Sequence, residues 1–543
     1  MHLNYHVFYG IIYLYIIGSA YARIQTIYAY GNKLFYQNGT QFFIAGVAYQ
    51  PPLRGDADHY KNPLADPASC ERDLRYFLEL GINTIRVYTV NPENNHDYCM
   101  RLFENSGIYV LLDLSEPRNS IISTDPSWNV RLFWRYSKVI DNMHKYPNLL
   151  GFFAGNEVIL DTENTHSAAY VKAAVRDVKS YMRSKGYRKI LVGYAANQHE
   201  HTPIPSANYF ACGKFCIKLV IFLGSICNIY FLCLKNIYLL HFSYEWCDPT
   251  SYETSGYRDR VNDFRNYNVP IFFSEYGCNI VNGKIGVRSF SQVPHIYSEK
   301  MTDVFSGGIV YEWFQNVNNY GLVNLLPDNT ISVRQDFLNL REQLRRINPK
   351  AIQRSTYTPR NGPPECPAIG QYWSSSTLLP PIPNSELCAC ASRASSCIAV
   401  NDITDAEIAE IFSYICGEIS CKAVSKDSKI GLYGAFSVCE PIDQLNVILN
   451  LYYNKHHRQE SACNFKGLAY VVTSETSKTC SSLLQIVGID GSGTITGPPV
   501  ATGFGKEKDS RDGKESLGKA IYPDWRLIFG IMTYFFGIII VIA

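Results

Sequence analysis

The chain has 543 residues, of which 46% are hydrophobic and 18% are charged. This composition supplies enough apolar residues for a folded core and excludes a mostly disordered protein. Lys and Arg number 50 and Asp and Glu 48, so the formal net charge is only +2. The basic excess of a protein that binds many phosphates is absent, and we expect no nucleic-acid partner.

Both ends of the chain carry patterns of processing signals. Residues 7–17 are apolar and lead to the small residues Ala20 and Ala22, which predicts a secretory signal peptide over residues 1–22. At the other end, residues 527–543 are uncharged and apolar, and a polar segment precedes them. This pattern predicts a removable glycosylphosphatidylinositol (GPI) attachment signal over residues 520–543, with a plain membrane-spanning tail as the alternative.

The 17 cysteines fall into two even groups and one odd group. Such a number in a secreted chain predicts a disulfide framework rather than a metal site, and no pair of closely spaced metal ligands accompanies it. We expect neither a metal nor a cofactor. Six cysteines are spread over the first two thirds, eight lie between residues 388 and 480, and three belong to one apolar segment (Cys216, Cys227 and Cys233).

That segment, residues 214–242, is anomalous. It has 16 uncharged residues in a row, from Leu219 to Leu234, which is long enough to suggest a membrane helix. A spanning helix here would place the two cysteine-rich halves in different compartments, so another origin is favoured. Residues 213–215 can be encoded by a sequence containing a splice-donor-like GTAAGT, and we interpret the segment as a translated intron or a misplaced exon boundary. Sequencing of the transcript decides between these origins and a native segment.

From residue 41 to residue 313, short apolar runs alternate with amphipathic stretches. This alternation predicts a (β/α)8 TIM barrel over residues 23–355, with a doubly wound open sheet as the alternative. Expected helices include 68–80, 130–143 and 167–185. Only seven strands are visible, and the missing one should lie between residues 194 and 269. The expected strands are 42–48, 83–88, 108–114, 150–155, 190–194, 269–274 and 308–312.

Three further segments follow the barrel. Residues 356–385 are rich in Pro and Ser and are expected to be a linker that packs partly against the barrel. The eight clustered cysteines predict a small disulfide-rich helical module over residues 386–486, with its connectivity left open. Residues 487–519 are expected to be a flexible linker that contains the GPI attachment region.

Two glutamates stand where a barrel enzyme places its reactive groups. Glu157 and Glu275 each follow or end an apolar run expected to be a strand, so both should reach the mouth of the barrel. A retaining glycosidase needs such a pair, because one carboxyl protonates the leaving oxygen while the other attacks the anomeric carbon. Asn156 would then bind the sugar 2-hydroxyl. The alternative is that each glutamate is an ordinary loop residue.

The sequence around these two glutamates, and much of the rest of the chain, resembles that of the fungal β-1,3-glucanosyltransferases of glycoside hydrolase family 72. The resemblance rests on residues 38–51 and 66–92, on FFAGNEV around Glu157, and on FFSEYGCN around Glu275. It implies that Glu157 is the acid/base and Glu275 the nucleophile. It further implies donor-sugar contacts from Gln50, Tyr88, Asn156, Tyr244 and Tyr311.

The resemblance also implies the covalent and domain organisation. It implies that the eight-cysteine module binds β-1,3-glucan, of the type called carbohydrate-binding family 43; stabilising the barrel is its alternative role. A monomer on the outer face of the plasma membrane and in the cell wall is expected, with β-1,3-glucan as donor and acceptor. Asn38 begins an Asn-Gly-Thr glycosylation sequence. The implied bridges are Cys70–Cys99, Cys212–Cys366 and Cys247–Cys278.

Two departures from the family pattern affect the expected activity. Gln198 and Pro203 stand near positions where family members carry an acidic residue and an Arg that hold the acceptor sugar. The apolar segment 214–242 replaces the stretch that should supply the sixth strand, and it threatens the fold of the barrel. An endo-β-1,3-glucanase and a catalytically silent glucan-binding wall protein are therefore the alternatives to the transferase.

Overall fold

The computed structural model describes residues 24–51, 61–117, 119–197, 200–213, 215–223, 226–234, 240–244, 251–281, 283–359, 361–488 and 490–502, and it describes no side chains between 214 and 250. The predicted signal peptide, the GPI signal, Gln198 and Cys247 lie outside these residues. Within the described ranges, no helix is both long and apolar enough to cross a bilayer.

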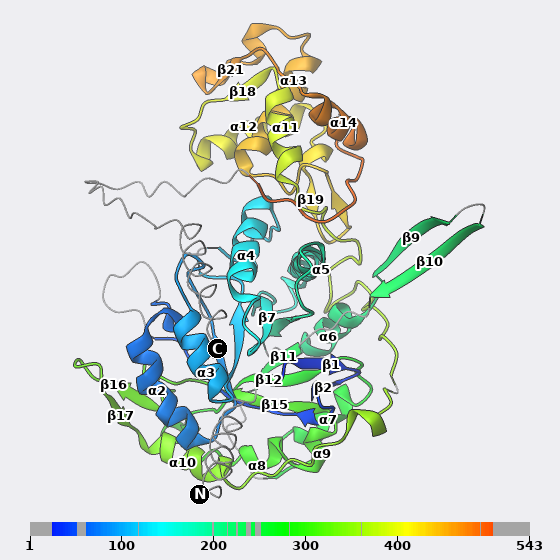
Figure 1. Ribbon diagram of the computed structural model, residues 1–543. Coiled ribbons are helices and arrows are strands. Elements are labelled where there is room, and N and C mark those ends of the chain that lie inside the picture. The colour runs from blue at the N-terminus through cyan, green and yellow to red at the C-terminus, as the bar shows by residue number, and fades with distance from the viewer. Residues whose placement is uncertain are drawn as a thin grey trace, which may run out of the picture. The chain divides into compact units, whose positions relative to one another are not determined.

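Eight parallel strands close into a barrel (Figure 1). The last strand pairs with the first, with Gly307 to Val310 opposite Ile44 to Val47, so the ring has no open edge. This confirms the (β/α)8 architecture and excludes the open sheet. In chain order the strands are β4 (Ile44–Ala48), β5 (Thr84–Val87), β6 (Tyr109–Asp113), β7 (Leu149–Asn156), β8 (Leu191–Ala196), β11 (Leu240–Tyr244), β12 (Ile271–Tyr276) and β15 (Phe305–Val310).

Successive residues of a barrel strand are buried in two different hydrophobic cores, one inside the barrel and one between the strands and the helices. In β6, Leu111 belongs to the inner cluster that fills the barrel, whereas Val110 and Leu112 belong to the outer cluster between strands and helices. Because side chains alternate along a strand, a strand covered on both faces must be apolar throughout. This is why the barrel strands were visible in the sequence as continuous apolar runs.

Helices connect the strands and cover the outside of the barrel (Figure 1). Asp66 caps the N-terminus of α2 by accepting from the Ser69 amide, and Asn129 caps α4 in the same way. The bounds of α4 match the expected helix 130–143. The barrel helices are α2 (Pro67–Leu80), α3 (Asp97–Asn105), α4 (Val130–Met143), α5 (Ala168–Ser184), α6 (Pro203–Ala211), α7 (Tyr257–Phe264), α8 (Val293–Ile296), α9 (Glu299–Thr302) and α10 (Gln335–Leu344).

Short antiparallel sheets are present in addition to the barrel. Each has two or three strands and lies outside the ring of eight. They are β1 (Ile27–Tyr30) with β2 (Lys33–Tyr36) and β3 (Gln41–Phe42), β13 (Ile280–Val281) with β14 (Lys284–Ile285), and β16 (Val323–Leu325) with β17 (Ile331–Val333).

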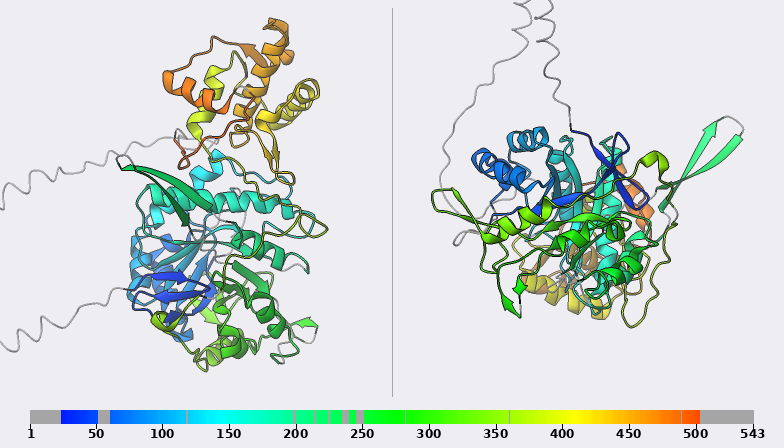
Figure 2. Two further views of the ribbon diagram at one scale, coloured as in Figure 1. Left: turned by 90° about the vertical axis from the view of Figure 1, so that its right-hand side faces the viewer. Right: turned by 90° about the horizontal axis from the view of Figure 1, so that it is seen from below.

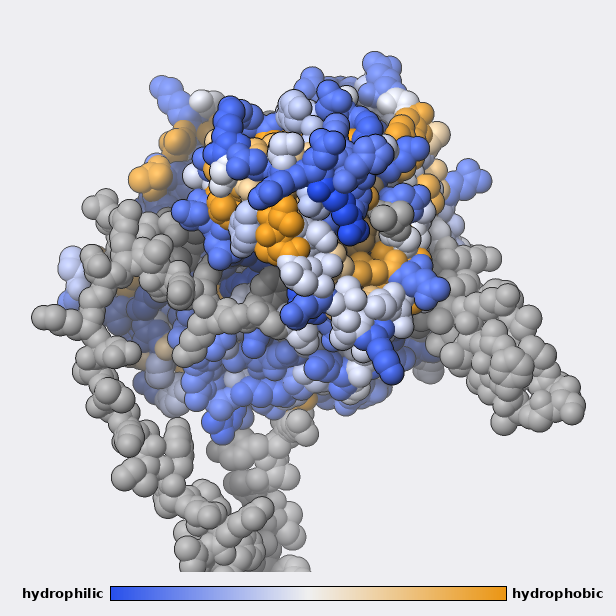
Figure 3. All heavy atoms as spheres, turned by 90° about the horizontal axis from the view of Figure 1, so that it is seen from above, coloured by the Kyte–Doolittle hydropathy of each residue, from blue (hydrophilic) through white to orange (hydrophobic). Residues whose placement is uncertain are grey.

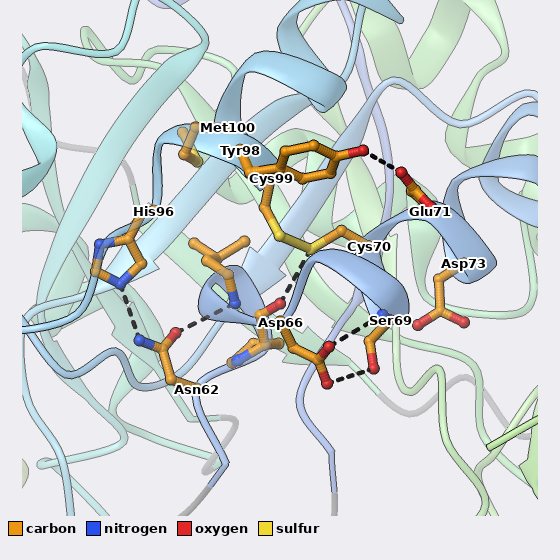
Figure 4. The surroundings of a disulfide bond; sticks show 12 residues. Asn62, Asp66, Ser69, Cys70, Glu71, Asp73, His96, Tyr98, Cys99 and Met100 are labelled. Atoms are coloured by element: carbon orange, nitrogen blue, oxygen red, sulfur yellow. Dashed lines mark hydrogen bonds between the residues drawn. A yellow bond between two sulfur atoms is a disulfide. The ribbon is translucent and has the colours of Figure 1, made fainter. Parts of the chain in front are cut away.

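A disulfide joins the first two barrel helices. Cys70 of α2 and Cys99 of α3 are bonded, and the Asn62 side chain contacts His96 at 2.8 Å beside them (Figure 4). The second expected bridge, Cys212–Cys366, is also present and ties the end of α6 to the linker. Cys278 is disulfide-bonded, but its expected partner Cys247 lies outside the described residues.

The anomalous segment does not remove the sixth strand. Its last residues form β11, which pairs with β8 on one side and β12 on the other. The residues before them form an antiparallel hairpin of β9 (Phe215–Leu223) and β10 (Ile226–Leu234), which is a separate two-stranded sheet (Figures 1 and 2). The expected strand between residues 194 and 269 is therefore confirmed. The expectation that the segment replaces it was wrong, because the hairpin lies in the connection before β11 and leaves the ring closed.

Deleting Phe215–Leu234 should leave the barrel folded and active. The variant keeps three residues after Ala211 and five before Leu240, and these eight residues can join α6 to β11. The secreted yield should rise, because two strand edges open to association are removed. Secreted yield, thermal unfolding and transfer activity would be measured beside a control that replaces the hairpin with Gly and Ser residues of equal number. Loss of folding in both variants would show that the barrel needs the hairpin.

The cysteine-rich module is helical and is held by four disulfides. Its bonds resolve the open connectivity as Cys388–Cys439, Cys390–Cys480, Cys397–Cys463 and Cys416–Cys421. Its elements are α11 (Ser385–Ala394), β18 (Cys397–Ala399), α12 (Asp405–Glu418), β19 (Lys426–Asp427), β20 (Leu432–Tyr433), α13 (Pro441–Lys455), β21 (Ala469–Val471) and α14 (Lys478–Val487).

The linker and the module both contact the outer helices of the barrel. In the linker, Trp373 is buried and its ring centroid lies 5.0 Å from that of Tyr209 on α6. The amide of Val130, at the start of α4, donates to the Val438 carbonyl of the module at 2.8 Å. Lys426 of the module pairs with Asp125 at 2.7 Å. The linker thus packs against the barrel as expected.

The described part of the segment after the module is not a free linker. Val500 exchanges backbone hydrogen bonds with Pro383 and Ser385, and the Ala435 amide donates to the Gly491 carbonyl. A Cβ at Gly491 would lie 2.8 Å from the Ala423 Cα, and its φ is +63°. The expectation of flexibility was therefore wrong up to residue 502, because glycine here permits close backbone packing.

Candidate active site

The two glutamates lie at the same end of the barrel. Glu157 directly follows β7, and Glu275 is the fifth of the six residues of β12. Since the carboxyl ends of parallel strands meet at one mouth, both side chains belong to that mouth. Glu157 has a φ of +49°, rare for a residue with a side chain, and its amide donates to the Ala195 carbonyl at 2.7 Å.

A buried arginine connects Glu275 to the neighbouring strand ends. The Arg86 guanidinium on β5 is fully buried and forms a two-pronged ion pair with Asp113 of β6, at 3.1 and 2.9 Å. The same group donates to Glu275 Oε1 at 3.1 Å, to Ser274 Oγ at 2.7 Å and to Asn156 Oδ1 at 2.8 Å. Four strands therefore present their polar side chains in fixed relative positions.

Tyr88 also binds the Glu275 carboxylate. Its hydroxyl donates to Oε1 at 2.6 Å, the same oxygen that accepts from Arg86. Within the described part of the chain, both donors bind the same carboxylate oxygen, Oε1. The arrangement is suited to a nucleophile that is held firmly and ionised when it reacts.

Burial raises the pKa of Glu275 to about 7, from an ordinary value of 4.5. The Arg86 charge and the Tyr88 hydrogen bond oppose this rise, whereas the Glu157 charge adds to it. Both carboxyl groups follow or end strands of the same barrel, so the Glu157 charge acts on Glu275 at one mouth.

Replacing Tyr88 with Phe should move the acidic limb of the pH–kcat/KM profile to higher pH. The hydrogen bond from Tyr88 lowers the pKa of Glu275, so its loss raises that pKa and requires a higher pH for ionisation. The measurement is the profile for a laminari-oligosaccharide between pH 4 and 9. Tyr136→Phe is a suitable control, because the Tyr136 hydroxyl binds the buried Ala154 carbonyl. A limb that moves equally in both variants would contradict this role of Tyr88.

Glu275 should also make the stability of the protein depend on pH. Its folded-state pKa lies above its ordinary value, so the folded state binds the extra proton between pH 4.5 and about 7. The contribution of Glu275 to stability should therefore fall as the pH rises through this window, by about 3 kcal/mol. Glu275→Gln lacks this titration. The free energy of unfolding of this variant, relative to that of the wild-type protein, should therefore increase from pH 4.5 to pH 7. Denaturant unfolding of both proteins at several pH values measures it; a constant difference would contradict the raised pKa.

The structure brings most of the expected sugar-binding residues to this site. Tyr88 and Asn156 contact Glu275 or its partner Arg86 directly. The Tyr311 amide donates to the Tyr276 carbonyl at 3.0 Å, which places Tyr311 beside the end of β12 that carries Glu275. The Tyr244 backbone pairs with β12 at the same mouth, but its side chain lies outside the described residues.

Two other residues singled out in the sequence, Gln50 and Pro203, have structural contacts of their own. The Gln50 side chain accepts from the Thr89 amide at 3.2 Å and donates to the Lys61 carbonyl at 2.9 Å, so it joins two loops at the mouth. Pro203 is the first residue of α6 and is buried. It therefore offers no surface for an acceptor sugar.

Sequence reasoning missed Arg86 and Asp113. The sequence did contain a signal for them, because each is a charged residue within or at the end of a short run expected to be a buried strand: Arg86 in TIRV and Asp113 in YVLLD. A buried charge is tolerated only when it is paired, so two such strands next to each other predict a pair. The contacts of this pair with Glu275 and Asn156 depend on the closed barrel and could not be read from spacing.

A (β/α)8 barrel with a buried, hydrogen-bonded glutamate and a second glutamate at its mouth is the arrangement that a glycosidase-type enzyme requires. Comparison with known families agrees: residues 16–348 match the glucanosyltransferase family, glycoside hydrolase family 72, and residues 395–470 match the X8 domain. The chain belongs to the glucanosyltransferase family and is a glucanosyltransferase.

Named relatives cover both parts of the chain. It is 40% identical over 488 residues to 1,3-beta-glucanosyltransferase gas1 of Schizosaccharomyces pombe, covering 89% of this chain and 85% of the relative. It is 37% identical over 490 residues to 1,3-beta-glucanosyltransferase GAS2 of Saccharomyces cerevisiae, covering 87% and 84%. The structure of Saccharomyces cerevisiae Gas2p in complex with laminaripentaose matches with a TM-score of 0.73 and 37% identity, covering 83% of this chain and 98% of that one.

Proposed function

We propose that this glucanosyltransferase cuts an internal linkage of β-1,3-glucan and joins the new reducing end to another glucan chain, with retention of configuration. The observation that carries the mechanism is the Glu275 carboxylate, whose Oε1 is held by Arg86 and Tyr88. The substrate assignment is supported by the relatives named 1,3-beta-glucanosyltransferase and by the laminaripentaose complex of Gas2p.

In the first half-reaction, the Glu275 carboxylate attacks the anomeric carbon of the donor. The carbon–oxygen glycosidic bond breaks as Glu157 gives its proton to the leaving oxygen, and the donor fragment remains bound to Glu275 as an ester. Arg86 and Tyr88 keep the carboxylate oriented, and Asn156 is aligned by Arg86 to bind the sugar 2-hydroxyl.

In the second half-reaction, the acceptor sugar supplies a hydroxyl group. Glu157, now ionised, takes the hydroxyl proton while the oxygen attacks the anomeric carbon and the ester bond to Glu275 breaks. Water in place of the acceptor would give hydrolysis. Gln198 and Pro203 stand near the positions of the expected acidic residue and Arg, so we expect other residues to hold the acceptor sugar.

Three features support an extracellular, wall-associated protein. Disulfides in the barrel and in the module require an oxidising compartment. Asn38 lies exposed in the turn between β2 and β3, where a glycan can be attached. The C-terminal tail supplies the proposed GPI signal, and the X8 domain supplies the proposed glucan-binding module.

We also propose that the protein acts as a monomer. The face shown in Figure 3 is largely hydrophilic, and its hydrophobic residues fall in separate small patches. Scattered apolar residues of this kind do not suit this face to a stable homodimer interface, which buries a larger continuous patch. Analytical ultracentrifugation of the secreted protein tests this point.

Incubation with reduced laminari-oligosaccharides tests the activity. The secreted protein should yield products longer than the substrate, because the donor fragment is passed to a second oligosaccharide. Shorter products alone would assign the endo-glucanase activity, and binding without products would assign a silent wall protein. The variant lacking Phe215–Leu234 would be assayed in parallel, so that an effect of the hairpin on the site is detected.

A further inference from the structure

A second buried arginine lies beneath the mouth of the barrel. Arg288 follows the β13–β14 hairpin, and its side chain is 1% exposed. Its Nε donates to Asp336 Oδ1 at 2.7 Å. Its Nη1 donates to the carbonyls of Gly277 and Tyr311, at 3.2 and 2.6 Å, and its Nη2 donates to the Tyr320 carbonyl.

The three carbonyls belong to segments that shape the proposed site. Gly277 lies two residues after Glu275, and Tyr311 directly follows β15. Tyr320 ends the loop that returns from β15, and its ring packs edge-on against Tyr311 with centroids 5.4 Å apart. The Asn318 side chain of this loop contacts the Tyr311 hydroxyl at 3.4 Å.

The loop has little freedom to adopt another path. A Cβ at Gly321 would lie 2.1 Å from the Gln315 Cα, so the two ends of the loop are in close contact. The Leu322 amide donates to the carbonyls of Glu312 and Trp313. The position of Tyr311 is therefore set by the backbone around it. Arg288 joins this backbone to the end of β12, and Asn279, which follows β12, adds a hydrogen bond to the Asn318 carbonyl of the loop at 2.9 Å.

Only arginine matches this geometry. A planar guanidinium can donate in several fixed directions at once, whereas an ammonium group is a single point charge. Asp336, in the first turn of α10, is 3% exposed and neutralises the charge that burial would otherwise make costly. The guanidinium carbon also lies 4.7 Å from the Phe290 ring centroid and 5.7 Å from that of Tyr320, so aromatic rings pack against the charged group.

We propose that Arg288 and Asp336 form a positioning pair that fixes Tyr311 relative to Glu275. This inference rests on the proposed roles of Glu275 as nucleophile and Tyr311 as a donor-sugar contact. Arg288 touches neither the substrate nor the reacting atoms. It holds the ends of β12 and β15 at the separation that lets a donor sugar contact Tyr311 while its anomeric carbon faces Glu275. Loss of this geometry should lower the rate of the chemical step more than substrate affinity.

Steady-state kinetics of Arg288→Lys on laminari-oligosaccharides tests the pair. We expect kcat to fall between about 10- and 100-fold, with KM changed by less than about threefold. Arg176→Lys is the matched control, because Arg176 pairs with the buried Asp177 on α5, away from the barrel mouth. It should lower the melting temperature but leave kcat within about twofold. A kcat of Arg288→Lys that stays within the same limit would overturn the proposal.

Asp336→Asn keeps the test decisive should Arg288→Lys fail to fold. Asparagine preserves the shape of the side chain but removes the charge that orients the guanidinium, so kcat should fall about three- to tenfold with little change in KM. An unchanged kcat in folded Asp336→Asn would count against the pair.

A double-mutant cycle separates positioning from general destabilisation. If Arg288 acts through Tyr311, Arg288→Lys should reduce kcat by a smaller factor in a Tyr311→Leu background than in the wild-type protein. Multiplicative effects would show that Arg288 does not act through Tyr311. Glu275→Gln, assayed in parallel, distinguishes failure of the proposed function from failure of the positioning pair. If Glu275→Gln stays active, the proposed function fails. If Glu275→Gln is inactive but Arg288→Lys has a normal kcat, only the positioning pair is wrong.

Discussion

Replacing Glu275 with Gln should lower transfer between laminari-oligosaccharides by at least about 10³-fold. An amide has no anionic oxygen to attack the anomeric carbon, so the glycosyl ester cannot form. The loss should persist with donors that carry a good leaving group, because nucleophilic attack is required whatever group departs. Product analysis by chromatography and release of a chromophoric leaving group would both be measured.

The variant should stay folded and should still bind donor. Arg86 keeps its ion pair with Asp113, and the amide oxygen of glutamine can accept from Tyr88. Thermal unfolding and calorimetric titration with laminaripentaose verify these two points. Near-normal transfer by a folded, donor-binding Glu275→Gln variant would show that the nucleophile has been misassigned.

The sequence predicted the barrel because its strands are buried on both faces and bounded by amphipathic helices. Strand β6 and helix α4 were placed within about one residue for this reason. The same apolarity concealed β11, because residues 240–242 merge with the long apolar run before them. Periodicity could not show where the hairpin ends and the barrel strand begins, since backbone pairing with β8 and β12 decides this boundary.

The site was predicted in part for a related reason. Glu157 and Glu275 could be found because each is an acidic residue at the end of an apolar run, and the fold sends both ends to one mouth. Arg86 and Arg288 act through partners 27 to 189 residues away or through backbone carbonyls, and no local pattern encodes such contacts. The segment around Gly491 was misread because its composition is typical of a flexible linker, although close packing also requires glycine.

Replacing Glu157 with Gln should produce a different defect from Glu275→Gln. Transfer between natural oligosaccharides should fall by about 10²- to 10⁴-fold, because neither protonation of the leaving oxygen nor activation of the acceptor hydroxyl remains. A laminari-oligosaccharide with a dinitrophenyl leaving group needs no proton to depart. Its first turnover should therefore stay within about tenfold of the wild-type rate.

The second half-reaction supplies the sharper distinction. Without the base, the ester on Glu275 should accumulate after one burst of dinitrophenol, and intact mass spectrometry should detect the added donor fragment. Azide is a nucleophile that needs no deprotonation, so it should restore turnover and yield a β-glycosyl azide, whose configuration records two inversions at the anomeric carbon. Equal loss with natural and activated donors, together with no effect of azide, would show that Glu157 is not the acid/base of the retaining mechanism.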